Sequence, residues 1–492
     1  MKDFQSYLEE SQEIGFVEQV VHALIYASGL PKVRPFEVVV FERGQVGQVI
    51  SLSEDLAEIL LLSTSAVKVG DKVCRTQTPL TVGVGEALLG ASVDALCNPF
   101  SGRIPRGSLS PRPLVTTPLG IGYRKNVDRP FETGVTIVDL AVPLGKGQRE
   151  LVIGDRKSGK TPFLQQVILT QARQGTICVY TAIAKRWFDT QNTIAFFKKN
   201  GVDKNIVTVV SGPAGAPGLV FLTPYTAITI AEYFRDQGKD VLVVLDDMTA
   251  HAKYYREITL SARRFPGRSA YPGDIFFVQS RILERAGNFI KGSITCLPVA
   301  ETVFRDFSGY IQTNLMSMTD GHIFFDGEYF NQGRRPAINA FLSVTRVGLQ
   351  AQSPIVRDIN RELSRFMVYY DEMQQFMHFG SELSLETRRT LSLGDRIVAC
   401  VDQGPEIIIP MNASAILFAA LWAGFWREVE IPTMKFEMQN LVAKYIKDSD
   451  YRAKINSLIE HSKDLADLVS KLKNNEGLIL EGSGGEKEYR KN

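Results

Sequence analysis

The chain has few cysteines, few histidines and no long apolar run, and each scarcity excludes a class of protein. Its 492 residues include five cysteines and five histidines, which are scattered without a CxxC pair or metal-ligand spacing. We therefore expect neither a disulfide framework nor a zinc site. The longest apolar run, residues 415–426, is shorter than the roughly 20 residues that a membrane-spanning helix needs.

Basic and acidic side chains are nearly balanced. The 56 Lys and Arg against 54 Asp and Glu leave a net charge of +2, which does not favour nucleic acid as the main partner. The contents of 44% hydrophobic and 22% charged residues are typical of a folded chain, and the length predicts two to four domains. We see no signal or transit peptide and expect the protein to stay where it is made.

Three stretches of the chain differ in composition and in the pattern of their apolar residues. Up to residue 79, short Val- and Ile-rich segments broken by turns predict a small β-barrel or sandwich, with strands at 36–41, 46–52 and 57–62. From 80 to 352, apolar segments alternate with helical patterns, which predicts an α/β domain. Its expected strands are 150–153, 177–183, 206–210, 241–245, 275–279 and 342–346.

After about residue 353 the strand pattern fades, and one apolar stripe indicates a long packed helix. The stripe consists of Ile359, Leu363, Phe366, Tyr370, Met373 and Met377. The sequence thus predicts an α/β protein with a β-rich N-terminal part and a helical C-terminal part.

A glycine-rich segment fits the phosphate-loop pattern GxxxxGK[ST]. Its residues are Gly154, Asp155, Arg156, Lys157, Ser158, Gly159, Lys160 and Thr161. A predicted strand precedes it and a helical pattern follows, which is the context the pattern requires. The glycines allow backbone N–H groups to point into one concavity. Lys160 would reach the β- and γ-phosphates and the Thr161 hydroxyl would ligate Mg²⁺, so we predict a site for ATP or ADP.

A carboxylate is needed at the end of a neighbouring strand to hold the water shell of the Mg²⁺. Asp246 directly follows the predicted strand 241–245 and is our candidate. The alternative, that Asp246 and Asp247 only cap the next helix, stays open.

Further motifs at 263–274, 335–339 and 343–348 complete an ordered series. Together with the phosphate loop and Asp246, they resemble the α-subunit family of F-type ATP synthases, from about residue 14 to about residue 430. The resemblance implies a RecA-like P-loop nucleotide-binding domain at 80–352, between an N-terminal β-barrel at 1–79 and a C-terminal helical bundle at 353–492. It also implies an α3β3 ring with β-type subunits around a γ-type central shaft, in which this chain binds Mg-ATP without hydrolysing it.

The resemblance also assigns roles to single residues. Phe330, Arg335 and Gln403 match the adenine-binding positions, where a ring and a guanidinium can sandwich a base and an amide can read its edge. Arg346 matches the arginine finger that this subunit inserts into a neighbouring β site, worth about 10³–10⁵ in rate. The alternatives are ordinary core packing for Phe330 and an ordinary interface or surface position for Arg346. Pro405 stands where the family commonly has a second Gln.

Lys185 departs from the family. Catalytic relatives place a Glu after the strand that follows the phosphate-loop helix, and α subunits tend to have Gln there. An ammonium group cannot accept a proton from water unless its pKa is strongly lowered, so Lys185 predicts nucleotide binding without turnover. Lys185 itself either contacts phosphate or is a solvated surface lysine.

The resemblance further implies a peripheral membrane protein on the cytoplasmic face of a bacterial plasma membrane. In the family, an N-terminal arm docks the peripheral stalk through a δ-type subunit. Only about 13 residues precede the first expected strand here, so this docking stays open. A divergent F-type enzyme and an F1-like rotary ATPase that drives something other than proton transport are both compatible with these departures.

Two other functions compete. A self-sufficient hexameric ATPase of the secretion type predicts a Glu shortly after Ile183, which the sequence lacks. A RecA-type RNA helicase predicts basic and aromatic residues on the barrel, where instead there are Glu37, Glu42, Glu54, Asp55 and Glu58. ATP turnover by the isolated chain would favour the first, and salt-sensitive RNA binding the second.

Overall fold

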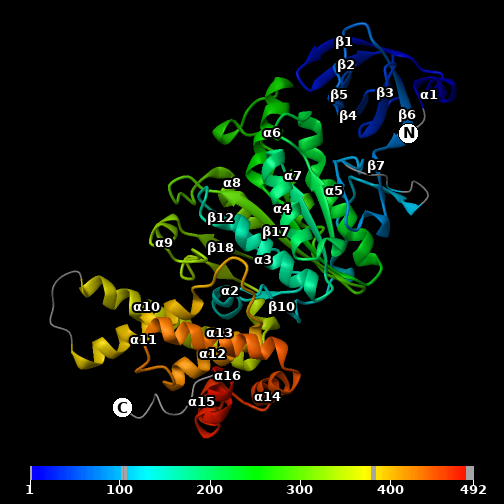
Figure 1. The fold of residues 1–492 in the computed structure, drawn as a ribbon. Helices are drawn as coiled ribbons and strands as arrows, with labels where there is room; N and C mark the ends of the chain where they lie inside the picture. Colours follow the sequence, from blue (N-terminus) through cyan, green and yellow to red (C-terminus); the bar gives the residue numbers. More distant parts are fainter. Residues whose placement is uncertain (1–2, 101–103, 105–107, 378–383, 484–492) are drawn as a thin grey trace. The chain divides into compact units, whose positions relative to one another are not determined.

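The computed structural model describes residues 3–100, 104, 108–377 and 384–483 (Figure 1). Its contacts divide the chain into two compact units, each discontinuous in sequence. The first consists of Met1–Lys125, Ala172–Thr302 and Asp306–Thr319, and the second of Asn126–Gln171, Val303–Arg305 and Asp320–Asn492. The three-domain division at residues 79 and 352 stays a prediction.

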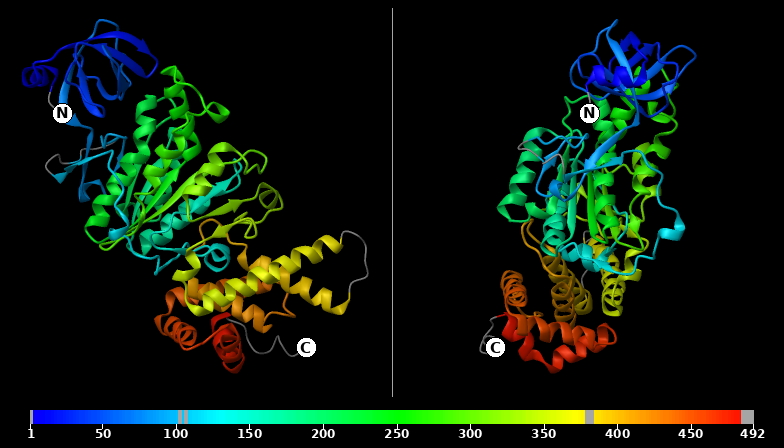
Figure 2. Two further views of the ribbon diagram at one scale, coloured as in Figure 1. Left: turned by 180° about the vertical axis from the view of Figure 1, so that it is seen from behind. Right: turned by 90° about the vertical axis from the view of Figure 1, so that its right-hand side faces the viewer.

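The first unit contains a closed antiparallel barrel of six strands in the order β1-β2-β5-β4-β3-β6, drawn in blue in Figure 2. The strands are β1 (Gly15–Val21), β2 (Leu24–Ser28), β3 (Glu37–Phe41), β4 (Val46–Leu52), β5 (Ala57–Leu61) and β6 (Lys72–Pro79), and the helix α1 (Phe4–Ser11) packs against β6. Ile25, Val39, Val49 and Ile59 are fully buried in the cluster inside it. Closure removes the exposed sheet edges. The three barrel strands predicted from the sequence are confirmed to within one residue.

The same unit contains a parallel sheet with the strand order β8-β14-β13-β15-β17 and β16 paired antiparallel to β17. These strands are β8 (Ser92–Val93), β13 (Ile177–Ala182), β14 (Ile206–Val210), β15 (Asp240–Asp246), β16 (Gly287–Asn288) and β17 (Ser293–Glu301). Every residue of β13 and β14 is buried, as expected for a parallel sheet covered on both faces. Because Ala182 pairs with Asp246, the loops after β13 and β15 leave the sheet side by side.

Helices pack around this sheet. They are α4 (Trp187–Lys199), α5 (Pro217–Asp236), α6 (Met248–Ser261), α7 (Ile275–Leu283) and α8 (Tyr310–Met318). The long helix α5 contacts β13, β14, β15 and β17. A separate pair, β7 (Thr81–Val84) and β9 (Ser110–Pro113), forms a two-stranded sheet.

In the second unit, β12 (Leu151–Gly154) pairs in parallel with β18 (Gly321–Phe325), and β19 (Val344–Thr345) pairs antiparallel to β18. The helix α3 (Lys160–Arg173) begins where the phosphate loop ends. The other short elements are β10 (Pro130–Phe131), α2 (Thr136–Ala141), β11 (Leu144–Gly145) and α9 (Gly327–Asn331). A strand, a loop and a helix therefore hold the glycine-rich motif, as its pattern predicted.

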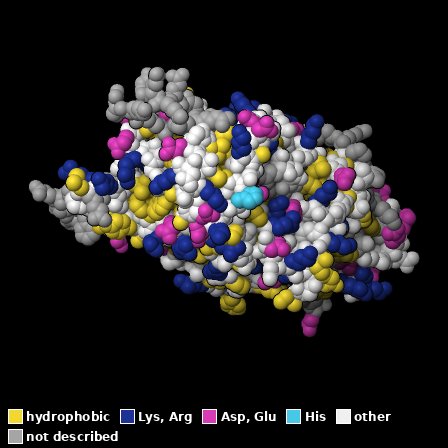
Figure 3. Space-filling model, turned by 90° about the horizontal axis from the view of Figure 1, so that it is seen from below, with side chains coloured by type: hydrophobic (Ala, Val, Ile, Leu, Met, Phe, Trp, Pro, Cys, Tyr) yellow, Lys and Arg dark blue, Asp and Glu magenta, His cyan; other side chains and the backbone are white. Residues whose placement is uncertain are grey.

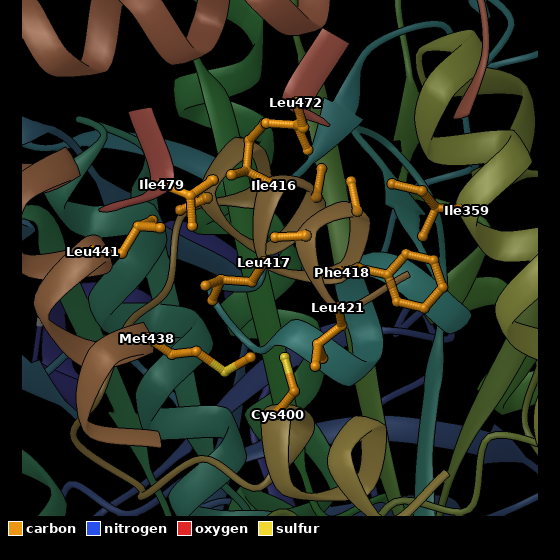
Figure 4. Packing of buried hydrophobic residues seen from close by; sticks show 14 of the residues in the cluster. Ile359, Cys400, Ile416, Leu417, Phe418, Leu421, Met438, Leu441, Leu472 and Ile479 are labelled. Atoms are coloured by element: carbon orange, nitrogen blue, oxygen red, sulfur yellow. The ribbon is translucent and has the colours of Figure 1, made fainter. Parts of the chain in front are cut away.

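The rest of the second unit is helical. Its helices are α10 (Pro354–Met377), α11 (Leu385–Val401), α12 (Met411–Ala423), α13 (Ile431–Lys447), α14 (Ser449–Glu460), α15 (Leu465–Asn474) and α16 (Glu476–Ser483). The stripe predicted from the sequence lies on α10, where Ile359, Leu363 and Tyr370 are buried. At the centre is α12, whose residues 413–421 are all buried. Phe418 points toward Ile359 of α10 (Figure 4), so a helix that is apolar all round forms the core.

One expected strand is wrong. Residues 275–279 begin the helix α7, in which Ile275, Gln279, Ile282 and Leu283 are buried at helical spacing. Phe277 is 60% exposed on the opposite side. A run of consecutive apolar residues does not by itself separate a strand from a helix. The strands β17 and β18 were not predicted from the sequence, and the strand expected at 342–346 shortens to Val344–Thr345.

Within the described residues, no helix combines the length and apolarity needed to cross a lipid bilayer. On the face shown in Figure 3, acidic and basic side chains are interspersed among apolar ones, in keeping with the nearly balanced charge.

Candidate nucleotide site

The phosphate loop is wound closely against its neighbours. A Cβ on Gly154 would lie 2.4 Å from the carbonyl oxygen of Phe325 on β18, so only glycine fits there. At Gly159 the reason for glycine is the backbone conformation, because its φ of 98° is one that residues with a side chain rarely adopt. The Ser158 hydroxyl donates to the Asp155 carbonyl at 2.8 Å and closes the turn.

Lys160 folds back over this loop. Its ammonium group donates to the carbonyl oxygens of Gly154 at 2.7 Å and Asp155 at 2.6 Å. Thr161 is exposed in the first turn of α3. Because backbone N–H groups at a helix N-terminus favour anions, the loop and the start of α3 are suited to phosphate.

The predicted adenine-binding residues Phe330 and Arg335 lie beside this loop. Phe330 ring atoms are 3.7 and 3.8 Å from where a Cβ on Gly159 would stand. The Arg335 guanidinium carbon is 3.8 Å from the centre of the Phe330 ring, and the guanidinium donates to the Phe330 carbonyl at 2.9 Å. The two groups stack on each other, and the binding of a base by them stays a prediction.

The amide of Gln403 is occupied by backbone groups. Its Nε2 donates to the carbonyls of Gly134 at 2.7 Å and Ile407 at 2.5 Å, and its Oε1 accepts from the Thr136 N–H at 3.0 Å. The backbone N–H of Gln403 donates to the Arg335 carbonyl at 2.6 Å. Gln403 therefore fixes the segment that carries Arg335, and the reading of a base edge by Gln403 stays a prediction.

Arg305 and Asp326, which were not predicted from the sequence, also adjoin the loop. The Arg305 guanidinium donates to Asp326 at 2.9 Å and lies 2.6 Å from Glu328. The Arg305 N–H donates to Asp155 Oδ1 at 3.2 Å. Asp326 is fully buried and directly follows the apolar strand β18, the same pattern that identified Asp246. That pattern could have revealed it.

In the first unit, Asp246 ends β15 and Lys185 follows β13. The Lys185 ammonium lies 2.8 Å from Asp246 Oδ1, with side chains 27% and 3% exposed. The Tyr180 hydroxyl donates to Asp246 Oδ2 at 3.3 Å. Burial lowers the pKa of Lys185, but the carboxylates of Asp246 and Asp247 outweigh burial, and the pKa is raised overall. Lys185 is therefore the cationic partner of a buried carboxylate.

Asp247 is the helix cap. Its carboxylate accepts from the Ala250 N–H at 2.5 Å at the start of α6. Burial raises its pKa to about 6 against the opposing charge of Lys185. The helix-capping alternative thus holds for Asp247, while the side chain of Asp246 faces Lys185.

Arg346 stands on a firmly held turn. Its N–H donates to the Asp320 carbonyl at 2.9 Å. The preceding Thr345 hydroxyl donates to the Pro143 carbonyl at 3.0 Å and accepts from the Gly348 N–H at 3.1 Å. The Arg346 side chain is exposed. The role of Arg346 in a neighbouring subunit stays a prediction.

Comparison with known proteins decides the family. The model of the ATP synthase alpha/beta family, nucleotide-binding domain, matches residues 134–345, and the model of the ATP synthase alpha/beta chain, C terminal domain, matches residues 352–475. The chain belongs to the ATP synthase alpha/beta family. ATP synthase subunit alpha of Mycoplasma capricolum subsp. capricolum is 36% identical over 99% of this chain and 95% of the relative. The same subunit of Petrotoga mobilis is 37% identical over 94% of this chain and 93% of the relative. That of Sulfurovum sp. is 38% identical over 88% of this chain and 88% of the relative.

These relatives confirm the resemblance inferred from the sequence. The chain is of the alpha type within the family, with the expected barrel, nucleotide-binding α/β part and helical part. A place in an ATP synthase complex and a nucleotide-binding character follow from this membership. The roles of single residues stay predictions.

Proposed function

We propose that this chain is the nucleotide-binding, non-hydrolytic subunit of a rotary ATP synthase or ATPase. It alternates with β-type subunits in an α3β3 ring around a γ-type shaft, on the cytoplasmic face of a membrane. It holds ATP or ADP with residues 154–161, Phe330 and Arg335. The close approach of Phe330 to Gly159 supports one shared site for base and phosphates.

The observation that carries this proposal is the ion pair between Lys185 and Asp246. Hydrolysis requires a group that orients the attacking water and takes its proton. At the position where catalytic relatives carry Glu, this chain has an ammonium group that is bonded to a carboxylate at 2.8 Å. Asp247, the residue after Asp246, caps a helix. Neither group is placed to act as the base.

The Thr161 hydroxyl and the Asp246 carboxylate are oxygen ligands of the kind that Mg²⁺ prefers. Mg²⁺, when bound, would neutralise phosphate charge. Asp246 would hold the ion through a water molecule. The Lys185 ammonium group would compete with the ion for Asp246 Oδ1. Among the residues that the structure describes, no cluster of three or more His, Cys, Asp or Glu side chains is arranged to bind a metal.

Arg346 contributes to the neighbouring β-type site in this proposal. Its exposed side chain on a pinned turn can enter another subunit, where a guanidinium neutralises the charge that develops on the transferred phosphoryl group.

The test compares the purified chain with the chain assembled with its β-type partner. We expect the isolated chain to bind one ATP or ADP in calorimetry and to show no turnover, while the assembled ring hydrolyses ATP. The matched control is Lys160→Ala, which should lose nucleotide binding. Sustained turnover by the isolated chain would exclude the non-hydrolytic assignment.

A further inference from the structure

Two buried side chains lie next to the turn that carries Arg346. Gln148 and Glu150 come just before β12, and both are fully buried. Gln148 Nε2 donates to Glu150 Oε2 at 2.7 Å and to the Thr345 hydroxyl at 3.2 Å. Gln148 Oε1 accepts from the Gly145 N–H at 2.9 Å. The Gln148 amide therefore links the Glu150 carboxyl group to the residue that directly precedes Arg346.

The strand before this turn is short. β19 ends directly before Arg346, is two residues long and pairs with β18. The hydroxyl of its last residue, Thr345, donates to the Pro143 carbonyl and accepts from the Gly348 N–H and from Gln148. A hydroxyl group has one donor and two acceptor sites, so all three are filled. The position of Arg346 therefore depends on side-chain bonds, and Gln148 supplies one of them.

The Glu150 carboxyl group fills a space that a glycine leaves free. A Cβ on Gly321, the residue of β18 that pairs with Thr345, would lie 2.7 and 2.8 Å from the two carboxyl oxygens of Glu150. Oε2 accepts from Gln148, but Oε1 has no hydrogen-bond partner among the described residues. A buried polar atom without a partner is costly and calls for a reason. The place of Glu150 beside the Arg346 turn offers one.

The charge of Arg346 also acts on Glu150. Burial raises the pKa of Glu150 well above its ordinary value, and the hydrogen bond from Gln148 opposes this shift. The Asp320 carboxylate raises the pKa further, and the Arg346 guanidinium lowers it. The net shift favours the protonated carboxyl group, which an amide can replace with nearly the same shape. Glu150, Asp320 and Arg346 thus form one electrostatic cluster.

We propose that Glu150 and Gln148 are positioning residues for Arg346. Glu150 orients the Gln148 amide, Gln148 holds the Thr345 hydroxyl, and the turn thereby presents the Arg346 guanidinium in one direction. This role rests on the proposed function, in which Arg346 enters the neighbouring β-type site. It adds that the rate at that site depends on two residues that are buried inside this chain.

The test is steady-state ATP hydrolysis by the ring assembled with the β-type partner. Gln148→Met, which keeps the length of the side chain but removes its amide, should lower kcat by about 10–100-fold, because a small misplacement of a catalytic group has effects of this size. KM and the nucleotide affinity of this chain should not change. Glu150→Leu should resemble Gln148→Met, whereas Glu150→Gln should keep the wild-type kcat, because its amide oxygen still accepts from Gln148.

The matched control is Gln171→Met. Gln171 is equally buried near the C-terminal end of α3, and its Nε2 donates to the Glu132 carbonyl at 2.6 Å, so this variant should keep the wild-type kcat. Thr345→Val, which removes the hydroxyl and keeps the shape, takes the place of Gln148→Met if that variant does not assemble. Circular dichroism and size-exclusion chromatography verify the folding and assembly of each variant.

A double variant separates positioning from a general loss of stability. In a ring that carries Arg346→Ala, Gln148→Met should cause no further loss of kcat, because the group that it positions is gone. Losses that multiply in the double variant, or a wild-type kcat of Gln148→Met, would overturn the proposal. Undiminished turnover of Arg346→Ala alone would instead refute the proposed role of Arg346, and the positioning role with it.

Discussion

Lys185 and Asp246 form an ion pair of 2.8 Å between the loop after β13 and the end of β15. The pair neutralises a carboxylate that is almost fully buried. It occupies the edge of the sheet at which the sequence predicts magnesium chemistry. The carboxylate that is predicted to hold the water shell of Mg²⁺ is therefore already paired with a cation of the same chain.

Replacing Lys185 with Met should destabilise the protein. The Asp246 carboxylate would keep only the Tyr180 hydroxyl, and an unpaired buried charge is costly. Because the Lys185 side chain is 27% exposed, we reduce the full penalty and expect a loss of about 2 kcal/mol. Urea unfolding measures the loss.

The control for this variant is Arg186→Ala. The neighbouring pair of Arg186 and Asp189 is exposed at 79% and 45%, and such pairs contribute at most about 1 kcal/mol. Equal stability of Lys185→Met and wild type would show that the buried pair has no energetic weight.

Arg346→Ala should lower ATP hydrolysis by the assembled ring by about 10³-fold, the lower range for a finger supplied in trans. The nucleotide affinity of this chain should stay within about threefold of wild type, well under the tenfold that corresponds to 1.4 kcal/mol. The measurement is steady-state turnover beside calorimetry. The control is Arg452→Ala, an exposed arginine on α14. Undiminished turnover would remove Arg346 from the catalytic mechanism.

His251 should make stability depend on pH. It is fully buried on α6, its ring stacks on Phe221 at 5.3 Å, and its Nε2 lies 3.2 Å from the Phe221 carbonyl. Its Nδ1 has no hydrogen-bond partner among the described residues. Burial lowers the pKa of His251 from 6.5 to about 4.

Because the pKa is lowered on folding, the contribution of His251 is complete above pH 6.5 and is lost as the pH falls toward 4. Over that window the loss amounts to about 3 kcal/mol. His251→Phe should keep the stacking and remove this part of the acid sensitivity, as urea titrations at pH 7 and pH 4 would measure. Identical pH profiles of variant and wild type would contradict the lowered pKa.

Gly154→Ala should destabilise the protein by about 1–3 kcal/mol, because the new methyl group would collide with the Phe325 carbonyl. Gly120→Ala is the matched control, since a Cβ there meets nothing within 4 Å. Thermal unfolding of both variants measures the difference. A harmless Gly154→Ala would mean that the two strands can separate locally.

The sequence predicted the phosphate loop well because its signal is local. The strand before it, the glycines and the helix after it occupy one short stretch. The ion pair of Lys185 with Asp246 was not predictable in the same way, because it depends on β13 and β15 being neighbours. The order of strands in a sheet is set by long-range packing that one sequence does not display.

Long-range packing also explains why other features of the structure were not predicted from the sequence. The use of the Gln403 amide by the Gly134 and Thr136 backbone depends on segments far apart in the chain. The stacking of Arg335 on Phe330 is local and depends instead on how the chain turns between these two residues. For α7, the apolar run was visible but its period was not, since Phe276 and Phe277 are apolar and yet largely exposed.

The bidentate bond between Arg149 and Asp320 joins residues 171 positions apart, beside the pairing of β12 with β18. At roughly 5–20 residues per second of synthesis, about 10–30 s pass on the ribosome before β12 meets that strand. During that time β12 lacks the backbone hydrogen bonds that its pairing with β18 provides.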